Sequence, residues 1–145
     1  MLLGIATAGG PAGRLLIGRI PVPWPAALEI VAGVLLMLAG LVVASQARAD
    51  LGDSLRVAPT PLEDAELVDR GWYGRVRHPL YLAVFLGVVG WAAVWMNWFV
   101  LAVTAVIIVF FGMKTRYEER VLRENYRDYA DYMMRVKARF VPRVW

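Results

Sequence analysis

Three apolar runs, separated by polar segments, dominate the pattern of the chain. The first covers residues 26–45 and carries one charge, Glu29, near its start. The other two cover residues 79–96 and 98–113, on either side of Asn97. A helix of about 16 to 20 residues rises roughly 25 to 30 Å, which is close to the apolar thickness of a bilayer. The pattern therefore predicts one transmembrane helix followed by a tight transmembrane hairpin that turns at Asn97.

The segments outside these runs differ in character. Residues 1–20 are apolar but interrupted by Gly9-Gly10-Pro11 and by two arginines, which predicts a short, interfacial or kinked helix rather than a full span. No basic leader precedes this stretch, so it is not a convincing signal peptide. Residues 20–25 contain three prolines and predict a turn. Residues 46–78 form a long polar connection, and long connections often carry function.

The chain after Met113 is charged but keeps a helical period. Residues that recur every three or four positions share one face of a helix, and here they are Glu118, Leu122, Tyr126, Tyr129, Met133 and Val136. The ordinary interpretation of such a stripe is packing against the protein or the membrane surface. Glu118 is the exception, because a carboxylate on an apolar face needs a polar partner. The period therefore favours Glu118, rather than Glu119, as the inward carboxylate.

The composition fits a membrane protein. Of the 145 residues, 59% are hydrophobic and 19% are charged, which is too apolar for an ordinary soluble domain of this size. Cysteine is absent and His78 is the single histidine, so thiolate and multi-histidine metal sites are excluded within one chain and no metal is expected. The net charge of +4 does not indicate a nucleic-acid partner, because the basic residues flank the apolar runs.

The basic residues also predict an orientation. Nine lysines or arginines follow Met113 and five lie within residues 48–77, whereas the Asn97 turn has none. The positive-inside rule therefore places both charged segments in the cytoplasm. Whether residues 1–20 cross the bilayer stays open, and so does the oligomeric state.

These patterns predict an all-α integral membrane protein with three to four transmembrane helices in a single domain over residues 1–145. Its expected parts are a transmembrane helix over 26–45, a cytoplasmic connection over 46–78, the hairpin over 79–113 and a cytoplasmic C-terminal helical segment over 114–145.

Two polar clusters bracket the hairpin. Residues 77–81 read Arg-His-Pro-Leu-Tyr before it, and residues 116–119 read Arg-Tyr-Glu-Glu after it. Since both ends of a hairpin return to the same side of the membrane, we expect the clusters to form one site at the membrane surface. Pro79 suits the first turn of a helix, where its missing N–H would be unpaired anyway, and Tyr81 lies on the same side of that turn as His78.

These features resemble the isoprenylcysteine carboxyl methyltransferase family, whose superfamily includes the membrane phospholipid methyltransferases. The resemblance extends over about residues 51–145. It rests on residues 71–81, the hairpin, Glu118-Glu119-Arg120-Val121-Leu122, the pair Tyr129 and Tyr132, and Arg139-Phe140-Val141-Pro142. Two positions depart from the family pattern, with Trp72 in place of a proline and Ala83 in place of a glycine.

The resemblance implies an integral membrane enzyme that uses S-adenosylmethionine at a cytoplasmic-side site. The cofactor-binding residues it implies are Tyr73, Arg77, His78, Tyr81, Glu118 and Glu119, and the catalytic candidates are Arg116 and Glu119. The residue types also suit S-adenosylmethionine, because its sulfonium, amino-acid zwitterion and ribose diol require carboxylates and cationic donors. Which glutamate contacts the cofactor stays open.

Each candidate also has a structural interpretation. Arg77 and His78 could anchor the chain beside lipid phosphates, and Tyr73 could sit among the headgroups instead of stacking on adenine. The two glutamates could form a solvated ion-pair face with neighbouring cations, since Arg116 lies three residues before Glu119 and Arg123 four after it.

We predict methyl transfer to a lipidic or lipid-anchored acceptor, with a carboxylate as the first choice. An anionic acceptor needs in-line positioning and water exclusion more than a general base. An amine acceptor such as phosphatidylethanolamine must first lose a proton, which His78 or a glutamate could accept. A non-catalytic membrane scaffold or binder is the alternative from another class.

The composition, rich in Ala, Val, Arg and Gly, suggests a bacterial source and an inner-membrane location, with the site facing the cytoplasm.

Overall fold

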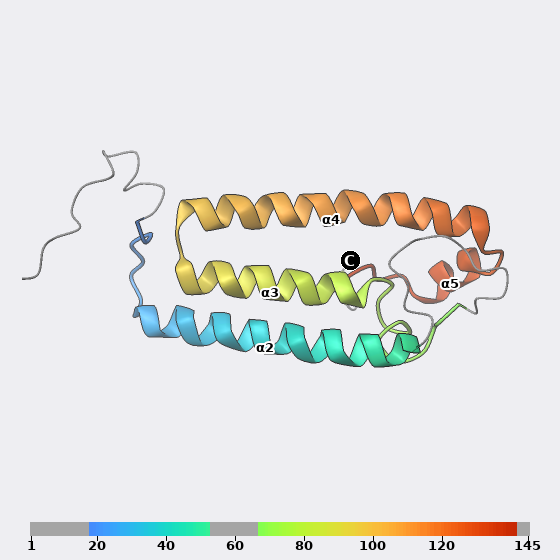
Figure 1. Cartoon of the computed structure of the whole chain (residues 1–145), viewed down its shortest axis with the longest axis horizontal. Helices are drawn as coiled ribbons and strands as arrows, with labels where there is room; N and C mark the ends of the chain where they lie inside the picture. Colours follow the sequence, from blue (N-terminus) through green and yellow to red (C-terminus); the bar gives the residue numbers. More distant parts are fainter. Residues whose placement is uncertain (1–17, 53–66, 142–145) are drawn as a thin grey trace, which may run out of the picture.

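The computed structural model describes residues 18–52 and 67–141 as three long helices and one short helix. The helices are α2 (Ala26–Leu51), α3 (Pro79–Trp95), α4 (Trp98–Asn125) and α5 (Tyr129–Arg135). The three long helices lie side by side with α3 in the middle, and α5 lies at the end where α2 and α4 finish (Figure 1). The predicted all-α fold with a hairpin at Asn97 is confirmed.

The long helices carry the surface of a membrane protein. Both α2 and α4 are long and apolar enough to cross a membrane, and α3 is a shorter apolar helix of 17 residues. Their large apolar side chains face outward: Leu35 and Leu41 of α2 and Val106 and Val109 of α4 are each 60% exposed or more. So much exposed apolar surface calls for lipid rather than water as the solvent. Most of the predicted N-terminal helix over residues 1–20 lies outside the described residues.

Small residues bring α2 and α3 into close contact. A Cβ on Gly33 of α2 would lie 2.5 Å from the backbone oxygen of Gly90 on α3, and a Cβ on Gly40 would lie 2.9 Å from the backbone oxygen of Ala83. Glycine lets transmembrane helices approach backbone to backbone in this way. α4 has fewer contacts with α3, so α3 packs mainly on α2 although the turn joins it to α4.

The hairpin turn is built by Asn97. Its side chain accepts a 2.9 Å hydrogen bond from a backbone N–H in the first turn of α4 and caps that helix. The segment before α2 docks on this turn, where the N–H of Ile20 donates to the carbonyl of Met96 at 2.7 Å and Arg19 pairs with the buried Glu29. The described part of residues 20–25 is non-helical up to Pro25, as predicted.

Two helices continue beyond their apolar runs, and for α4 the sequence predicts this. α2 continues to Leu51 instead of stopping at residue 45, because the stretch over 46–51 contains good helix formers and can remain helical in water. α4 runs without a break through Met113 to Asn125. The apolar hairpin arm and the first part of the charged segment are therefore one helix. Residues 53–66 of the predicted connection lie outside the described part of the chain.

Candidate functional site

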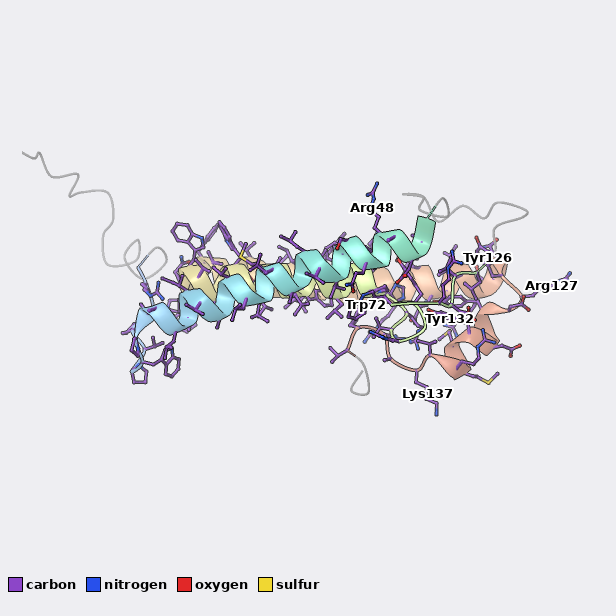
Figure 2. All side chains as sticks on the ribbon, turned by 90° about the horizontal axis from the view of Figure 1, so that it is seen from below. Arg48, Trp72, Tyr126, Arg127, Tyr132 and Lys137 are labelled. Carbon is purple, nitrogen blue, oxygen red and sulfur yellow. The ribbon has the colours of Figure 1, made fainter. Side chains whose placement is uncertain are left out.

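The site forms where the start of α3 meets the end of the described chain. The backbone N–H groups of Arg77 and His78 donate to the carbonyls of Ala138 and Arg139, both at 2.9 Å. Trp72, Tyr132 and Lys137 lie at this same end of the molecule (Figure 2). Arg77 and Tyr81 also form hydrogen bonds with Glu119 and Glu118 of α4, so these members of the two predicted polar clusters lie together.

Glu119 is the centre of the buried part of the site. It is 1% exposed and accepts a 2.8 Å hydrogen bond from Nε of Arg77. A guanidinium nitrogen of Arg139 lies 2.9 Å from Oε2 of Glu119, and Nε2 of His78 lies 3.4 Å from Oε1. Neither of these two contacts has hydrogen-bond alignment, so Glu119 Oε2 and His78 Nε2 have no hydrogen-bond partner among the described residues.

The charge of Glu119 is fixed by its surroundings. Glu119 lies in the polar part of α4, beyond the apolar run that ends at Met113 and thus outside the membrane-spanning segment. Burial alone would raise its pKa, but the adjacent His78 and Arg77 outweigh burial and lower the pKa to about 2. The carboxylate is therefore anionic at neutral pH and is a weak base.

Arg77 makes three hydrogen bonds within the protein. Besides its bond to Glu119, its guanidinium donates to the backbone carbonyls of Val136 and Lys137, both at 2.7 Å. Arg77 and Glu119 thus hold the C-terminal segment against α3 and α4.

Glu118 belongs to a separate, more open cluster. The hydroxyl of Tyr81 donates to its carboxylate at 2.7 Å, and the ammonium of Lys114 lies 2.9 Å from the same carboxylate. Lys114 also donates to the Tyr81 hydroxyl at 2.8 Å. We call Tyr81, Lys114 and Glu118 the polar rim. It adjoins the buried part through His78, whose ring stacks on Tyr81 with a centroid distance of 5.5 Å.

The prediction that Glu118 is the inward carboxylate is wrong, since Glu119 is the buried one. The predicted stripe assumes one continuous helix over residues 118–136. In the structure α4 ends at Asn125 and α5 begins at Tyr129, so the two halves of the stripe do not share one helix face. Glu119 instead follows the fully buried Thr115 by one turn, on the inner face of α4.

The aromatic part of the stripe packs as predicted. Tyr129, Tyr132 and Val136 form a buried cluster, and the side chains packed against it are those of Leu67, Leu122, Tyr126 and Met133. The hydroxyl of Tyr132 donates to the carbonyl of Tyr73 at 2.7 Å and ties α5 to the loop before α3. Burial raises the pKa values of Tyr129 and Tyr132, so both hydroxyls stay neutral.

The end of α2 holds the loop that leads into Arg77. Asp50 accepts a 2.7 Å hydrogen bond from the N–H of Trp72, and Gln46 accepts one of 2.8 Å from its indole. Gly71 has φ +58°, and a Cβ at this position would collide with the Asp50 side chain. Burial, followed by the nearby Asp50, raises the pKa of Tyr73 to about 12, so this hydroxyl is also neutral.

The predicted site residues therefore separate into groups. Tyr81 and Glu118 belong to the polar rim, and His78 stacks on Tyr81. Arg77 and Glu119 form the buried pair, and Tyr73 lies in the adjoining loop. Arg116 is exposed and makes no hydrogen bond or ion pair within residues 18–52 and 67–141. Arg123 donates to the backbone carbonyl of Glu119 rather than to its carboxylate, so the expected ion-pair face with the two arginines does not form.

Three residues of the site were not predicted. Lys114 precedes Glu118 by four residues, which is a recognisable helical ion-pair spacing. Arg139 lies in the terminal part of the family resemblance, but its contact with Glu119 has no local signal. Asp50 comes from a segment with no recognisable motif, and its contact with Trp72 spans 22 residues.

Comparison with known proteins adds independent information. The sequence matches the family described as phospholipid methyltransferase over residues 28–129. One curated relative is the nickel-cobalt-cadmium resistance protein NccN of Alcaligenes xylosoxydans xylosoxydans, which is 34% identical over 83 residues. Another is the cobalt-zinc-cadmium resistance protein CzcN of Cupriavidus metallidurans, which is 38% identical over 82 residues.

These matches cover 57% and 54% of this chain, and 38% and 36% of the two relatives. The chain thus spans well under half the length of these relatives. No solved structure matches the chain.

Proposed function

The chain belongs to the phospholipid methyltransferase family, and we propose that it uses S-adenosylmethionine to methylate the polar end of a lipidic or lipid-anchored acceptor. The family match over residues 28–129 carries this proposal, because it includes the hairpin and both glutamates. The match also confirms the resemblance that the sequence predicts. Membrane-exposed helices beside a charged site suit an enzyme whose acceptor lies in the bilayer.

Three groups of the site that are partly exposed or lack a hydrogen-bond partner fit the proposed cofactor. Glu118 is an anionic group with 19% exposure, which suits an ammonium or a ribose diol. His78 offers a buried ring nitrogen without a hydrogen-bond partner in the described residues, and the guanidinium of Arg139 is 28% exposed. When bound, S-adenosylmethionine supplies an electrophilic methyl group on a sulfonium. We assign its binding to Glu118, His78, Tyr81 and Tyr73, with Arg77 and Glu119 as positioning residues.

A carboxylate remains the first choice of acceptor. It is anionic at neutral pH and requires positioning beside the methyl group, which rigid surrounding residues can provide. The low pKa of Glu119 makes it a poor base, which argues against an acceptor that must be deprotonated there.

A phospholipid amine is the second candidate acceptor. The description of the matched family favours it directly. His78 is the residue that could take the proton, because its Nε2 has no hydrogen-bond partner in the described part of the chain.

We place the site on the cytoplasmic face of a bacterial inner membrane. More Lys and Arg side chains lie around the site than at the Asn97 turn, where Arg19 docks, and this difference supports the orientation. The two relatives are named for metal resistance. Residues 18–52 and 67–141 contain no group of three His, Cys, Asp or Glu side chains that could hold a metal ion, so we do not assign metal binding to this chain.

Cofactor binding can be tested by titration calorimetry of the purified chain with S-adenosylhomocysteine. We expect Glu118→Gln to weaken binding about tenfold or more, because a charge-assisted hydrogen bond is lost. Glu124→Gln is the matched control, since Glu124 is an exposed carboxylate on the same helix. An intact chain that binds no S-adenosylhomocysteine would favour a non-catalytic scaffold.

The acceptor can be identified by methyl transfer from labelled S-adenosylmethionine into a membrane lipid extract. Mild base releases the label from a methyl ester but not from a methylated amine. Release would support carboxylate methylation, and retention in a phospholipid band would support amine methylation.

A further inference from the structure

Lys114 is the cation of the polar rim that is open to a ligand. Its side chain is 42% exposed, compared with 19% for Glu118. It directly follows Met113, which ends the apolar run and is 65% exposed. The ammonium of Lys114 therefore lies at the boundary between the apolar and polar parts of α4, where the headgroup of a lipid would lie.

Resting on the proposed methyl transfer, we propose that Lys114 binds the carboxylate of the acceptor and thereby selects anionic acceptors over zwitterionic ones. Its present partners are the carboxylate of Glu118 at 2.9 Å and the hydroxyl of Tyr81 at 2.8 Å. A ligand carboxylate has the same chemistry as Glu118. Lys114 can therefore accept it without any new type of interaction.

The aromatic residues beside the rim suit the apolar part of the same acceptor. The ring centroids of Tyr81 and Phe111 are 4.8 Å apart, and those of Phe111 and Phe85 are 6.4 Å apart. Phe111 precedes Lys114 by three residues on α4, so the two lie near the same side of the helix. Apolar and charged groups thus follow one another along the boundary of α3 and α4. This order matches a molecule with a carboxylate at the end of an apolar chain.

The partner of Lys114 also links the two ligands. Glu118 is the carboxylate that we assign to the cofactor, and engagement of Glu118 by a cationic ligand would leave Lys114 without its anionic partner. An acceptor carboxylate would then replace Glu118 beside the ammonium. Donor and acceptor binding consequently favour each other by equal factors.

The test is a comparison of lipid binding by the full chain in phosphatidylcholine vesicles. Electron paramagnetic resonance of spin-labelled stearate, phosphatidic acid and phosphatidylcholine measures the fraction of each label that the protein restricts. The variants are Lys114→Met, Lys114→Arg and, as the matched control, Arg120→Met. Arg120 is an exposed cation on the same helix and makes no hydrogen bond or ion pair within the described residues.

We expect the intact chain to prefer stearate over phosphatidylcholine about fivefold, as one cation near a membrane surface would allow. This preference should be lost in Lys114→Met and kept in Lys114→Arg and Arg120→Met. Addition of S-adenosylhomocysteine should increase it in the intact chain.

Three results would overturn the inference: no stearate preference in the intact chain, an equal loss in Arg120→Met, or a preference for phosphatidic acid as strong as that for stearate. The last result would assign Lys114 to ordinary lipid phosphates. Calorimetry with S-adenosylhomocysteine on the same samples reports separately on the proposed function, because the lipid preference is measured without turnover.

Discussion

Nε of Arg77 donates a 2.8 Å hydrogen bond to Glu119, although the two residues are 42 positions apart in sequence. Both side chains are buried, and Arg139 of the C-terminal segment forms a second ion pair with Glu119. The neighbouring Glu118 lies outside this arrangement and pairs with Tyr81 and Lys114 instead. Adjacent positions on a helix point about 100° apart, which gives the two glutamates different tasks.

Replacement of each glutamate should therefore affect a different property. Glu119→Gln leaves Arg77 buried without its counter-ion, and breaking a buried pair typically costs about 3 to 5 kcal/mol. Glu118→Gln acts on a partly exposed cluster and should change stability by about 1 kcal/mol or less. Thermal unfolding in detergent measures both effects. Similar losses of stability in the two variants would contradict this division of tasks.

The low pKa of Glu119 predicts how stability depends on pH. Its carboxylate has a pKa of about 2 in the folded protein against an ordinary value of 4.5. A carboxylate with a depressed folded pKa contributes stability that is fully present above the ordinary value and is lost as the pH falls toward the folded value. The midpoint temperature of thermal unfolding should thus decrease as the pH is lowered from about 4.5 to about 2.

Glu119→Gln should flatten this part of the pH profile, because glutamine does not titrate. Glu124→Gln, which changes an exposed carboxylate on the same helix, should leave the profile unchanged. An unaltered slope in Glu119→Gln would show that other carboxylates cause the loss at low pH.

The hairpin was predictable from sequence, whereas the identity of the buried glutamate was not. Apolar length and Asn97 are local signals, and both lead to the observed helices and cap. The break between α4 and α5 has a weaker local signal, since residues 125–132 contain Asn125 and Asp128 but neither glycine nor proline. The packing of Tyr129 and Tyr132 in a buried cluster accompanies the break, and such tertiary contacts override a helical period.

Some contacts between the site and the rest of the chain were likewise predictable from sequence, and others were not. The prediction that residues 77–81 meet the charged segment after the hairpin follows from topology alone. The contact between Asp50 and Trp72 depends instead on where α2 ends, and α2 extends past its apolar run to Leu51. Hydropathy locates the membrane part of a helix but not its continuation into water.

Asp50 is expected to act as a positioning residue for the loop before Arg77. Asp50→Ala removes the acceptor for the N–H of Trp72, whereas Asp50→Asn keeps an oxygen in the same place. We expect Asp50→Ala to weaken S-adenosylhomocysteine binding about tenfold and Asp50→Asn to restore most of it. Calorimetry of both variants gives the answer. A loss of the same size in Asp50→Asn would indicate a role for the charge rather than for the hydrogen bond.

The contact between Gly33 and Gly90 predicts the effect of a single methyl group. A Cβ on Gly33 would lie 2.5 Å from the backbone oxygen of Gly90, and a backbone atom cannot move aside as a side chain can. We therefore expect Gly33→Ala to push α2 and α3 apart and to destabilise the fold by about 1 to 3 kcal/mol.

Gly87→Ala is the matched control, because a Cβ on Gly87 meets nothing within 4 Å. Since alanine is the better helix former, Gly87→Ala should leave the thermal unfolding midpoint in detergent unchanged or slightly raised. A midpoint for Gly33→Ala as high as that of the control would mean that the two helices do not pack backbone to backbone.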